Sequence, residues 1–113
     1  MAEHYKLDRV RDMADNDEDF VMALAAAFIE EVPEDAERLK KAVPSRDYHE
    51  TYQAAHKMKP TIELFDLGVY DELIEVQNWG KFEEEDKNID KQLQKVLKAV
   101  ENATNQIKAD FGL

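Results

Sequence analysis

Apolar residues recur at three- and four-residue intervals along most of the chain, which is the spacing of one face of an α-helix. The last segment shows this most clearly. Asn88 is expected to cap a helix there, and an apolar residue returns on almost every turn after it. These apolar residues are Ile89, Leu93, Val96, Val100 and Ile107. No run of β-branched and aromatic residues alternates with polar ones, so strand signals are nearly absent. The pattern predicts an all-α protein.

Capping residues and prolines divide the N-terminal half into helices. A short leading helix is expected over residues 7–14. The acidic run at 15–19 offers an N-cap and first-turn carboxylates to the apolar segment 20–29. Pro33 suits the first position of a separate helix, which should stop before Pro44, because the residue preceding a proline avoids the α region.

The C-terminal half contains further helix boundaries. Ser45 is expected to cap a long helix over 46–65, and Gly68 to mark its C-terminal stop. The next helix, over 69–79, should end at Gly80. With short connections between them, these segments predict an antiparallel four-helix bundle core with an additional short N-terminal helix.

Composition narrows the class of protein. The 113 residues fit one domain, to which we assign residues 1–113. Fifteen basic and 26 acidic residues give a net charge of −11, which repels nucleic-acid phosphates and anionic lipid. There is no cysteine, and "MAEHYKLDRV" has no apolar signal region. We expect a cytoplasmic monomer that binds neither nucleic acid nor membrane. It is either free-standing, which we favour, or a part of a larger kinase.

One histidine is distinguished by its neighbours. On the helix over 46–65, His56 lies about 130° from the centre of the apolar stripe, on the flank or outer face. Lys57 and Lys59 adjoin it, and no acidic residue occurs between Thr51 and Thr61. Neighbouring ammonium groups disfavour a further positive charge, so we expect a neutral, nucleophilic imidazole whose surroundings stabilise an added dianionic group. The alternative is an ordinary solvated histidine. The stripe comprises Tyr48, Ala55, Met58, Ile62 and Phe65, with Thr51 or Tyr52.

Pro60 breaks the helical pattern beside this histidine. Its nitrogen has no proton to donate to the carbonyl of His56, which costs about 3 kcal/mol in an ordinary helix interior. The proline is either tolerated there or opens space next to the imidazole. Local departures from pattern of this kind are expected at functional sites.

These residues resemble the histidine-containing phosphotransfer (HPt) domains of multistep two-component signalling. The family signature is a histidine, any residue, an apolar residue, lysine, and a small residue or proline, which reads here as His56-Lys57-Met58-Lys59-Pro60. Upstream, "DEDFVMALAAAFIEEVPEDAERLKKAV" resembles the second and third helices of the family. The resemblance covers roughly residues 5–80.

The resemblance implies a four-helix bundle whose exposed histidine carries a phosphoryl group. His56 would be the phosphoacceptor and Lys59 would stabilise the phosphoryl group. Asn78 or Gln77, with Asn78 preferred, would orient the imidazole. The domain would take the group from the receiver domain of a hybrid histidine kinase and pass it to a response-regulator receiver domain. It would be a carrier and not an enzyme, without a cofactor of its own, because the receiver would provide Mg²⁺.

One residue departs from the family pattern. Family members usually have glycine ten residues after the histidine, whereas this chain has Asp66, with Gly68 two residues further on. Either the turn is reshaped or the helix register shifts by a residue or two. The departure bears on the choice between Gln77 and Asn78 more than on His56.

The segment 20–29 is apolar nearly all round, which is more than one core-facing stripe requires. We assign Phe20, Leu24, Phe28 and Ile29 to the core. The small residues Ala23, Ala26 and Ala27 would then form a flat outer patch, and we predict partner docking through Ala27, Glu31 and Lys57. The alternative is that these alanines serve as helix formers alone.

Two other classes of function compete with phosphotransfer. The first is a non-catalytic helical interaction module that regulates a receiver domain or a histidine kinase. Such a module would be expected to have lost the histidine or the lysine, and this chain has both. The second is a metal-binding bundle. His49 and His56 are seven residues apart, which is a poor spacing for two ligands of one ion.

Overall fold

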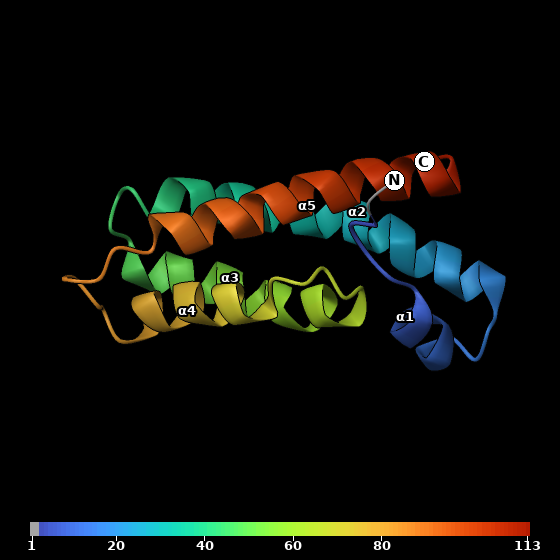
Figure 1. Ribbon diagram of the computed structural model, residues 1–113, viewed down its shortest axis with the longest axis horizontal. Coiled ribbons are helices and arrows are strands. Elements are labelled where there is room, and N and C mark those ends of the chain that lie inside the picture. Colours follow the sequence, from blue (N-terminus) through green and yellow to red (C-terminus); the bar gives the residue numbers. More distant parts are fainter. Residues whose placement is uncertain (1–2) are drawn as a thin grey trace.

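The computed structural model describes residues 3–113, which form five helices and, within that range, no strand (Figure 1). The all-α prediction is confirmed. The helices are α1 (Asp8–Met13), α2 (Glu18–Ala42), α3 (Tyr48–Leu64), α4 (Tyr70–Lys81) and α5 (Asp90–Phe111). The short leading helix expected over residues 7–14 is therefore present as α1.

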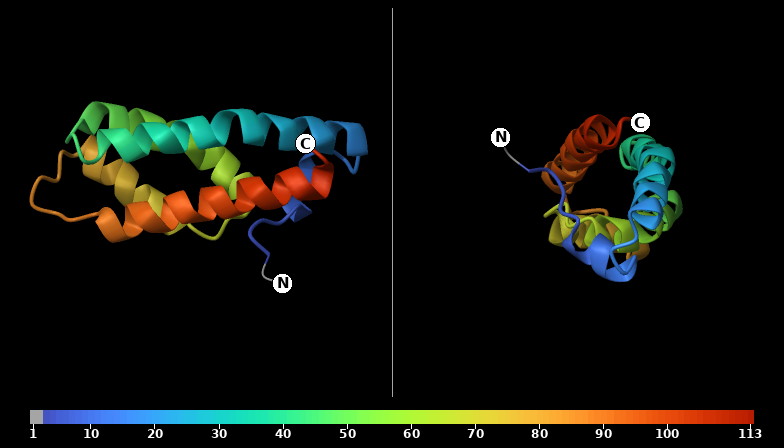
Figure 2. Two further views of the ribbon diagram at one scale, coloured as in Figure 1. Left: turned by 90° about the horizontal axis from the view of Figure 1, so that it is seen from above. Right: turned by 90° about the vertical axis from the view of Figure 1, so that its right-hand side faces the viewer.

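The four longer helices pack in a closed ring. α2 contacts α3 and α5, and α4 contacts the same two helices from the other side. The end-on view in Figure 2 shows these helices arranged around a common interior. Each helix turns its apolar stripe inward, and the largest fully buried side chains come from every helix as well as from two connecting segments. They are Val10, Val21, Phe28, Leu39, Met58, Ile62, Phe65, Leu73, Val76, Ile89, Val96 and Ile107.

The segment before α1 ties two helix ends together. The backbone N–H of Lys6 donates to the carbonyl of Phe65, which follows α3, at 2.8 Å. The hydroxyl of buried Tyr5 donates to Asp110 of α5 at 2.6 Å. Burial, together with this carboxylate, raises the pKa of the Tyr5 hydroxyl.

α2 begins and ends where the sequence predicts, but it is not divided. The side chain of Asp17 accepts hydrogen bonds from the N–H groups of the first turn, and the helix ends at Ala42, before Pro44. The prediction that Pro33 starts a separate helix is wrong, because α2 continues through this residue. Packing against α3 and α5 along its length stabilises α2 more than the one missing hydrogen bond destabilises it.

The core assignment in α2 is correct for Phe28, which is 1% exposed, and wrong for Phe20, which is 44% exposed. Leu24 and Ile29 lie partly buried against the edge of the core. Val21 occupies the buried position on the first turn instead of its neighbour, because the core stripe of α2 also contains Ala25, Phe28, Val32 and Leu39. The aromatic ring of Phe20 is therefore left on the surface.

Helix ends around α3 differ from the predictions by a few residues. Asp47, and not Ser45, caps α3, since its carboxylate accepts from the N–H of Glu50 at 3.1 Å. The helix ends at Leu64, so Gly68 lies in the following loop, with φ +78°. Asp66 has φ +51°, the left-handed conformation that glycine adopts most easily.

The remaining two boundaries concern α4 and α5. Gly80 lies inside α4, which ends one residue later at Lys81, so the predicted stop at this glycine is wrong. Its role is packing and not termination, as described below. The N-cap of α5 is Ile89, one residue after the predicted Asn88, although the Asn88 side chain accepts a hydrogen bond from the N–H of Asp90, the first residue of the helix, at 2.9 Å.

Candidate functional site

α3 carries His56 on its outer surface. The buried stripe of the helix is formed by Thr51, Ala54, Ala55, Met58 and Ile62, all of which face the ring interior. His56 follows Ala55 directly and is therefore rotated by about 100° from a buried position. Its side chain is exposed, as the spacing predicts. Thr51, and not Tyr52, completes the buried stripe.

The imidazole of His56 contacts one aromatic ring. The Tyr52 ring, one turn earlier on α3, stacks on it with centroids 5.5 Å apart and planes inclined by 23°. Within residues 3–113, no side chain or backbone group hydrogen-bonds to either ring nitrogen. Lys59, one turn later, is half-buried. The nitrogens are thus free to react, while one face of the ring is covered.

Pro60 lies within α3, and the helix continues through it to Leu64. Because proline has no N–H, the backbone carbonyl of His56 has no helical donor at that position. α3 therefore remains helical at Pro60, where the sequence suggested either a kink beside His56 or a tolerated proline.

A cluster of charged side chains joins α2 to α3 next to this site. Asp35 of α2 is buried, and its Oδ1 lies 3.3 Å from Nζ of Lys57 and 3.2 Å from Nη1 of Arg38. Arg38 also donates two hydrogen bonds to the Glu50 carboxylate, at 2.8 and 2.9 Å. The bonds from Arg38 hold the pKa of Glu50 below its ordinary value, and the same bonds raise the pKa of Arg38.

This cluster changes the charge environment expected from the sequence. Along α3 the neighbourhood of His56 is purely basic, but α2 adds a carboxylate, Asp35, which pairs with Lys57. Lys59 has no ion-pair partner among residues 3–113. Sequence reasoning missed Asp35. The available signal was the i, i+3 spacing of Asp35 and Arg38, which places opposite charges on one face of α2.

Gly80 of α4 lies very close to the backbone of α3 at Tyr48 and Tyr52. A Cβ atom on Gly80 would lie 2.6 Å from the carbonyl oxygen of Tyr48 and 2.8 Å from the backbone nitrogen of Tyr52. No residue with a side chain fits this contact without movement of a helix. Gln77 lies three residues before Gly80, on the same side of α4.

Gln77 and Asn78 differ in their surroundings. Gln77 is 8% exposed, and its Oε1 atom is buried without a hydrogen-bond partner among the described residues. Asn78 is half-buried. Neither side chain is hydrogen-bonded to His56 in the structure. A buried acceptor without a partner is costly unless another group or a bound molecule satisfies it.

The outer face of α2 includes two of the three predicted docking residues, Ala27 and Glu31, whereas Lys57 lies on α3. Ala23 and Ala26 are exposed, Ala27 is half-buried, and Glu31 is exposed. Phe20 adds an exposed aromatic ring to the same helix. The predicted small apolar patch is thus on the surface, and it is larger than expected because of Phe20.

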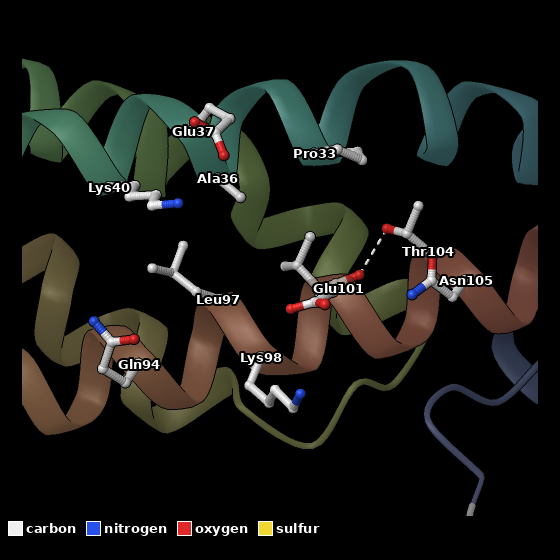
Figure 3. A pocket seen from close by; sticks show the side chains of 11 residues that line it. Pro33, Ala36, Glu37, Lys40, Gln94, Leu97, Lys98, Glu101, Thr104 and Asn105 are labelled. Carbon is white, nitrogen blue, oxygen red and sulfur yellow. Dashed lines mark hydrogen bonds between the residues drawn. The ribbon is translucent and has the colours of Figure 1, made fainter.

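A groove of about 490 Å³ lies between α2 and α5, on a different flank of α2 from Asp35. Figure 3 shows Ala36 and Lys40 of α2 across the groove from Leu97 of α5, with Pro33 farther along α2, nearer Thr104. A second hollow, of about 770 Å³, lies at the start of α3, and Tyr52 and Gly80 are among the residues that line it.

No family model, curated protein or solved structure matches the chain. Function is therefore inferred from the chemistry of the site. In the part of the chain from residue 3 onward, no helix combines the length and apolar content needed to cross a membrane. Over the same residues, no three histidine, aspartate or glutamate side chains gather as metal ligands would.

Proposed function

We propose that this protein is a histidine phosphocarrier. More particularly, it is a phosphorelay intermediate of the HPt type, which accepts a phosphoryl group on His56 from one receiver domain and passes it to another. The observation that carries the proposal is an exposed imidazole on the outer face of a packed helix, with neither ring nitrogen hydrogen-bonded within residues 3–113 and a lysine one turn away.

The chemistry of the proposed step needs little more than this imidazole. The lone pair of the unprotonated ring nitrogen attacks the phosphorus of an aspartyl phosphate on the receiver. The N–P bond forms as the P–O bond to the aspartate breaks, and the electron pair of that bond goes to the carboxylate. The second ring nitrogen keeps its proton, so the imidazole is a good leaving group when the reaction runs in the opposite direction to the next aspartate.

Lys59 is the cation best placed to stabilise the phosphoryl group. The pairing of Lys57 with Asp35 supports this choice, because a carboxylate at 3.3 Å offsets much of the charge of Lys57. Lys57 is still 55% exposed at its side chain, which suits a residue at the edge of a docking surface. We therefore assign stabilisation to Lys59 and partner contact to Lys57.

Gln77 is the better candidate for orienting the imidazole, although the sequence favoured Asn78. Its free Oε1 is an acceptor for the N–H of the second ring nitrogen, and the close contact at Gly80 brings this part of α4 against α3. A rotation of the Gln77 side chain toward His56 would satisfy both groups. Asn78 is the alternative, and substitution to leucine at each position in turn distinguishes them.

The ring of packed helices supports the finer description of the fold. We interpret α2, α3, α4 and α5 as an antiparallel four-helix bundle in one domain, with α1 as an additional short helix. In this arrangement α3 is a rigid helix that presents His56 at the surface. The outer face of α2, with Ala27 and Glu31, is a docking surface for a receiver domain. The small side chains there allow close approach of a partner helix.

The partners of such a carrier are the receiver domains of a hybrid histidine kinase and of a response regulator. The acidic site of the receiver would bring the Mg²⁺ ion that neutralises the transferring group. The net charge of −11 is unfavourable for nucleic-acid binding. We place the protein in the cytoplasm, as a monomer without an enzymatic activity of its own.

The test is incubation with a receiver domain that carries a labelled aspartyl phosphate, in the presence of Mg²⁺. We expect label to appear in this protein, to be lost in acid, and to be absent from His56→Gln. His49→Gln is the matched control and should accept label like the wild type, because it removes another exposed histidine of α3. Acid-stable label, or label that persists in His56→Gln, would refute the assignment.

A non-catalytic interaction module is the second candidate. The exposed apolar residues of α2 favour it independently of His56, because they offer a contact surface whether or not phosphotransfer occurs. Binding of a receiver domain without transfer of label, in trials with several receivers, would support this candidate instead.

A further inference from the structure

The contact between Tyr52 and His56 is the most specific feature around the imidazole. Residues four apart on a helix lie on the same face, and the 5.5 Å separation of the centroids is typical of offset aromatic stacking. The histidine is exposed, whereas Tyr52 is half-buried. With no hydrogen bond to either nitrogen in the described chain, this stack is the main restraint on rotation of the imidazole.

The backbone that carries Tyr52 is fixed by α4. Gly80 approaches the backbone nitrogen of Tyr52 so closely that a Cβ atom there would lie 2.8 Å from it. The preceding turn of α3 is held by a second aromatic pair, between Tyr48 and Trp79 of α4, with centroids 4.6 Å apart. Tyr52 is therefore attached to a rigid part of the molecule, and its ring transmits that rigidity to His56.

We propose that Tyr52 is a positioning residue for phosphoryl transfer at His56, an inference that rests on the proposed function. The lone pair of an imidazole nitrogen lies in the plane of the ring. A partner stacked on the face leaves the edges open, so it restricts rotation about the Cβ–Cγ bond without blocking either nitrogen. Transfer requires the nitrogen, the phosphorus and the leaving oxygen to be in line, so a ring with fewer orientations reaches that geometry more often.

The same contact acts on the charge that develops during transfer. When the N–P bond forms and the second nitrogen keeps its proton, the imidazole ring becomes positively charged. The face of a tyrosine ring attracts a cation. Tyr52 thus favours the protonated phosphoimidazole, which is the form that releases the phosphoryl group to the next aspartate.

The test compares Tyr52→Leu, which keeps apolar bulk without an aromatic face, with Tyr52→Phe, which keeps the ring. Phe82→Leu is the matched control, because it removes an exposed aromatic ring that follows α4 and leaves the Tyr52–His56 stack and its supports in place. The first measurement is the NMR shift of the carbon-bound ring protons of His56. We expect a ring-current displacement in the wild type and in Tyr52→Phe, and its loss in Tyr52→Leu.

The second measurement is the rate of phosphoryl transfer at saturating, aspartate-phosphorylated receiver domain with Mg²⁺. We expect Tyr52→Leu to be slower by about 10- to 100-fold, with half-saturation at an unchanged receiver concentration. Tyr52→Phe and Phe82→Leu should transfer at close to the wild-type rate. Wild-type transfer by Tyr52→Leu, or an equal loss in Tyr52→Phe or Phe82→Leu, would overturn the role of Tyr52 while leaving phosphotransfer intact. Absence of label from the wild type would overturn both proposals.

Discussion

Replacement of Gly80 by alanine adds one methyl group at the point where α4 touches the backbone of α3. The new Cβ would meet the Tyr48 carbonyl oxygen at 2.6 Å and the Tyr52 nitrogen at 2.8 Å, whereas ordinary contact begins at 3.4 Å. Both atoms belong to the backbone, so no side-chain rotation relieves the clash and one helix must move. Overpacking of this kind typically costs about 1–3 kcal/mol.

Alanine also has a favourable effect that must be subtracted. In a helix interior it is more stable than glycine by about 1 kcal/mol. We therefore expect Gly80→Ala to lower the free energy of unfolding by up to about 2 kcal/mol, and by more if the helices separate along their length. For a chain of this size, the melting temperature should fall by roughly 3–6 °C for each kcal/mol.

Urea denaturation and thermal melting measure the loss, and fluorescence tests its cause. Trp79 is the sole tryptophan, and its ring packs against Tyr48 in a tilted arrangement, next to the glycine in sequence. Its native emission should therefore change when α4 moves away from α3. Gly112→Ala is the control, because nothing lies within 4 Å of that position. Its φ of +65° should make the control cost about 1 kcal/mol as well, but with unchanged emission.

A Gly80→Ala variant that is as stable as the wild type, with unaltered Trp79 emission, would refute the tight α3–α4 contact. The outcome also bears on the site, because this contact sets the distance between α4 and the turn of α3 that carries Tyr52.

Three further predictions concern single side chains. Lys59→Ala should keep the fold by circular dichroism and shorten the lifetime of the phosphoryl group on His56 by about fivefold, which corresponds to about 1 kcal/mol; an unchanged lifetime would remove its assigned role. Glu50→Gln should cost under about 1 kcal/mol near neutral pH, because the pair with Arg38 is partly exposed. Since the pKa of Glu50 is lower in the folded than in the unfolded state, the pair stabilises the protein at pH values above the unfolded pKa of about 4.3, and this stabilisation is lost as the pH falls through the lower folded pKa. Urea titrations in which Glu50→Gln is still less stable than the wild type in strong acid would contradict this. Asp66→Gly should raise the free energy of unfolding by roughly 0.5–1 kcal/mol in urea, because glycine adopts the left-handed conformation without steric cost, and a less stable variant would argue against strain at this residue.

Much of the local structure follows from the sequence, because it depends on neighbours within one or two turns. Apolar spacing predicts the buried stripe of α3 and, from it, the exposure of His56. Asp17 as the cap of α2 and the end of that helix before Pro44 are equally local. Each of these features needs only the 3.6-residue period, a side-chain acceptor or the geometry of proline.

Tertiary structure decided what lies opposite each helix. Pro33 remains inside α2 because α3 and α5 hold that helix on both sides, and Phe20 is exposed because Val21 faces the core. The carboxylate of Asp35 reaches Lys57 from 22 residues away, and Gly80 meets Tyr52 across a helix interface. Such contacts depend on which faces meet and at what distance, and this is a property of the whole packed ring that spacing along one helix does not contain.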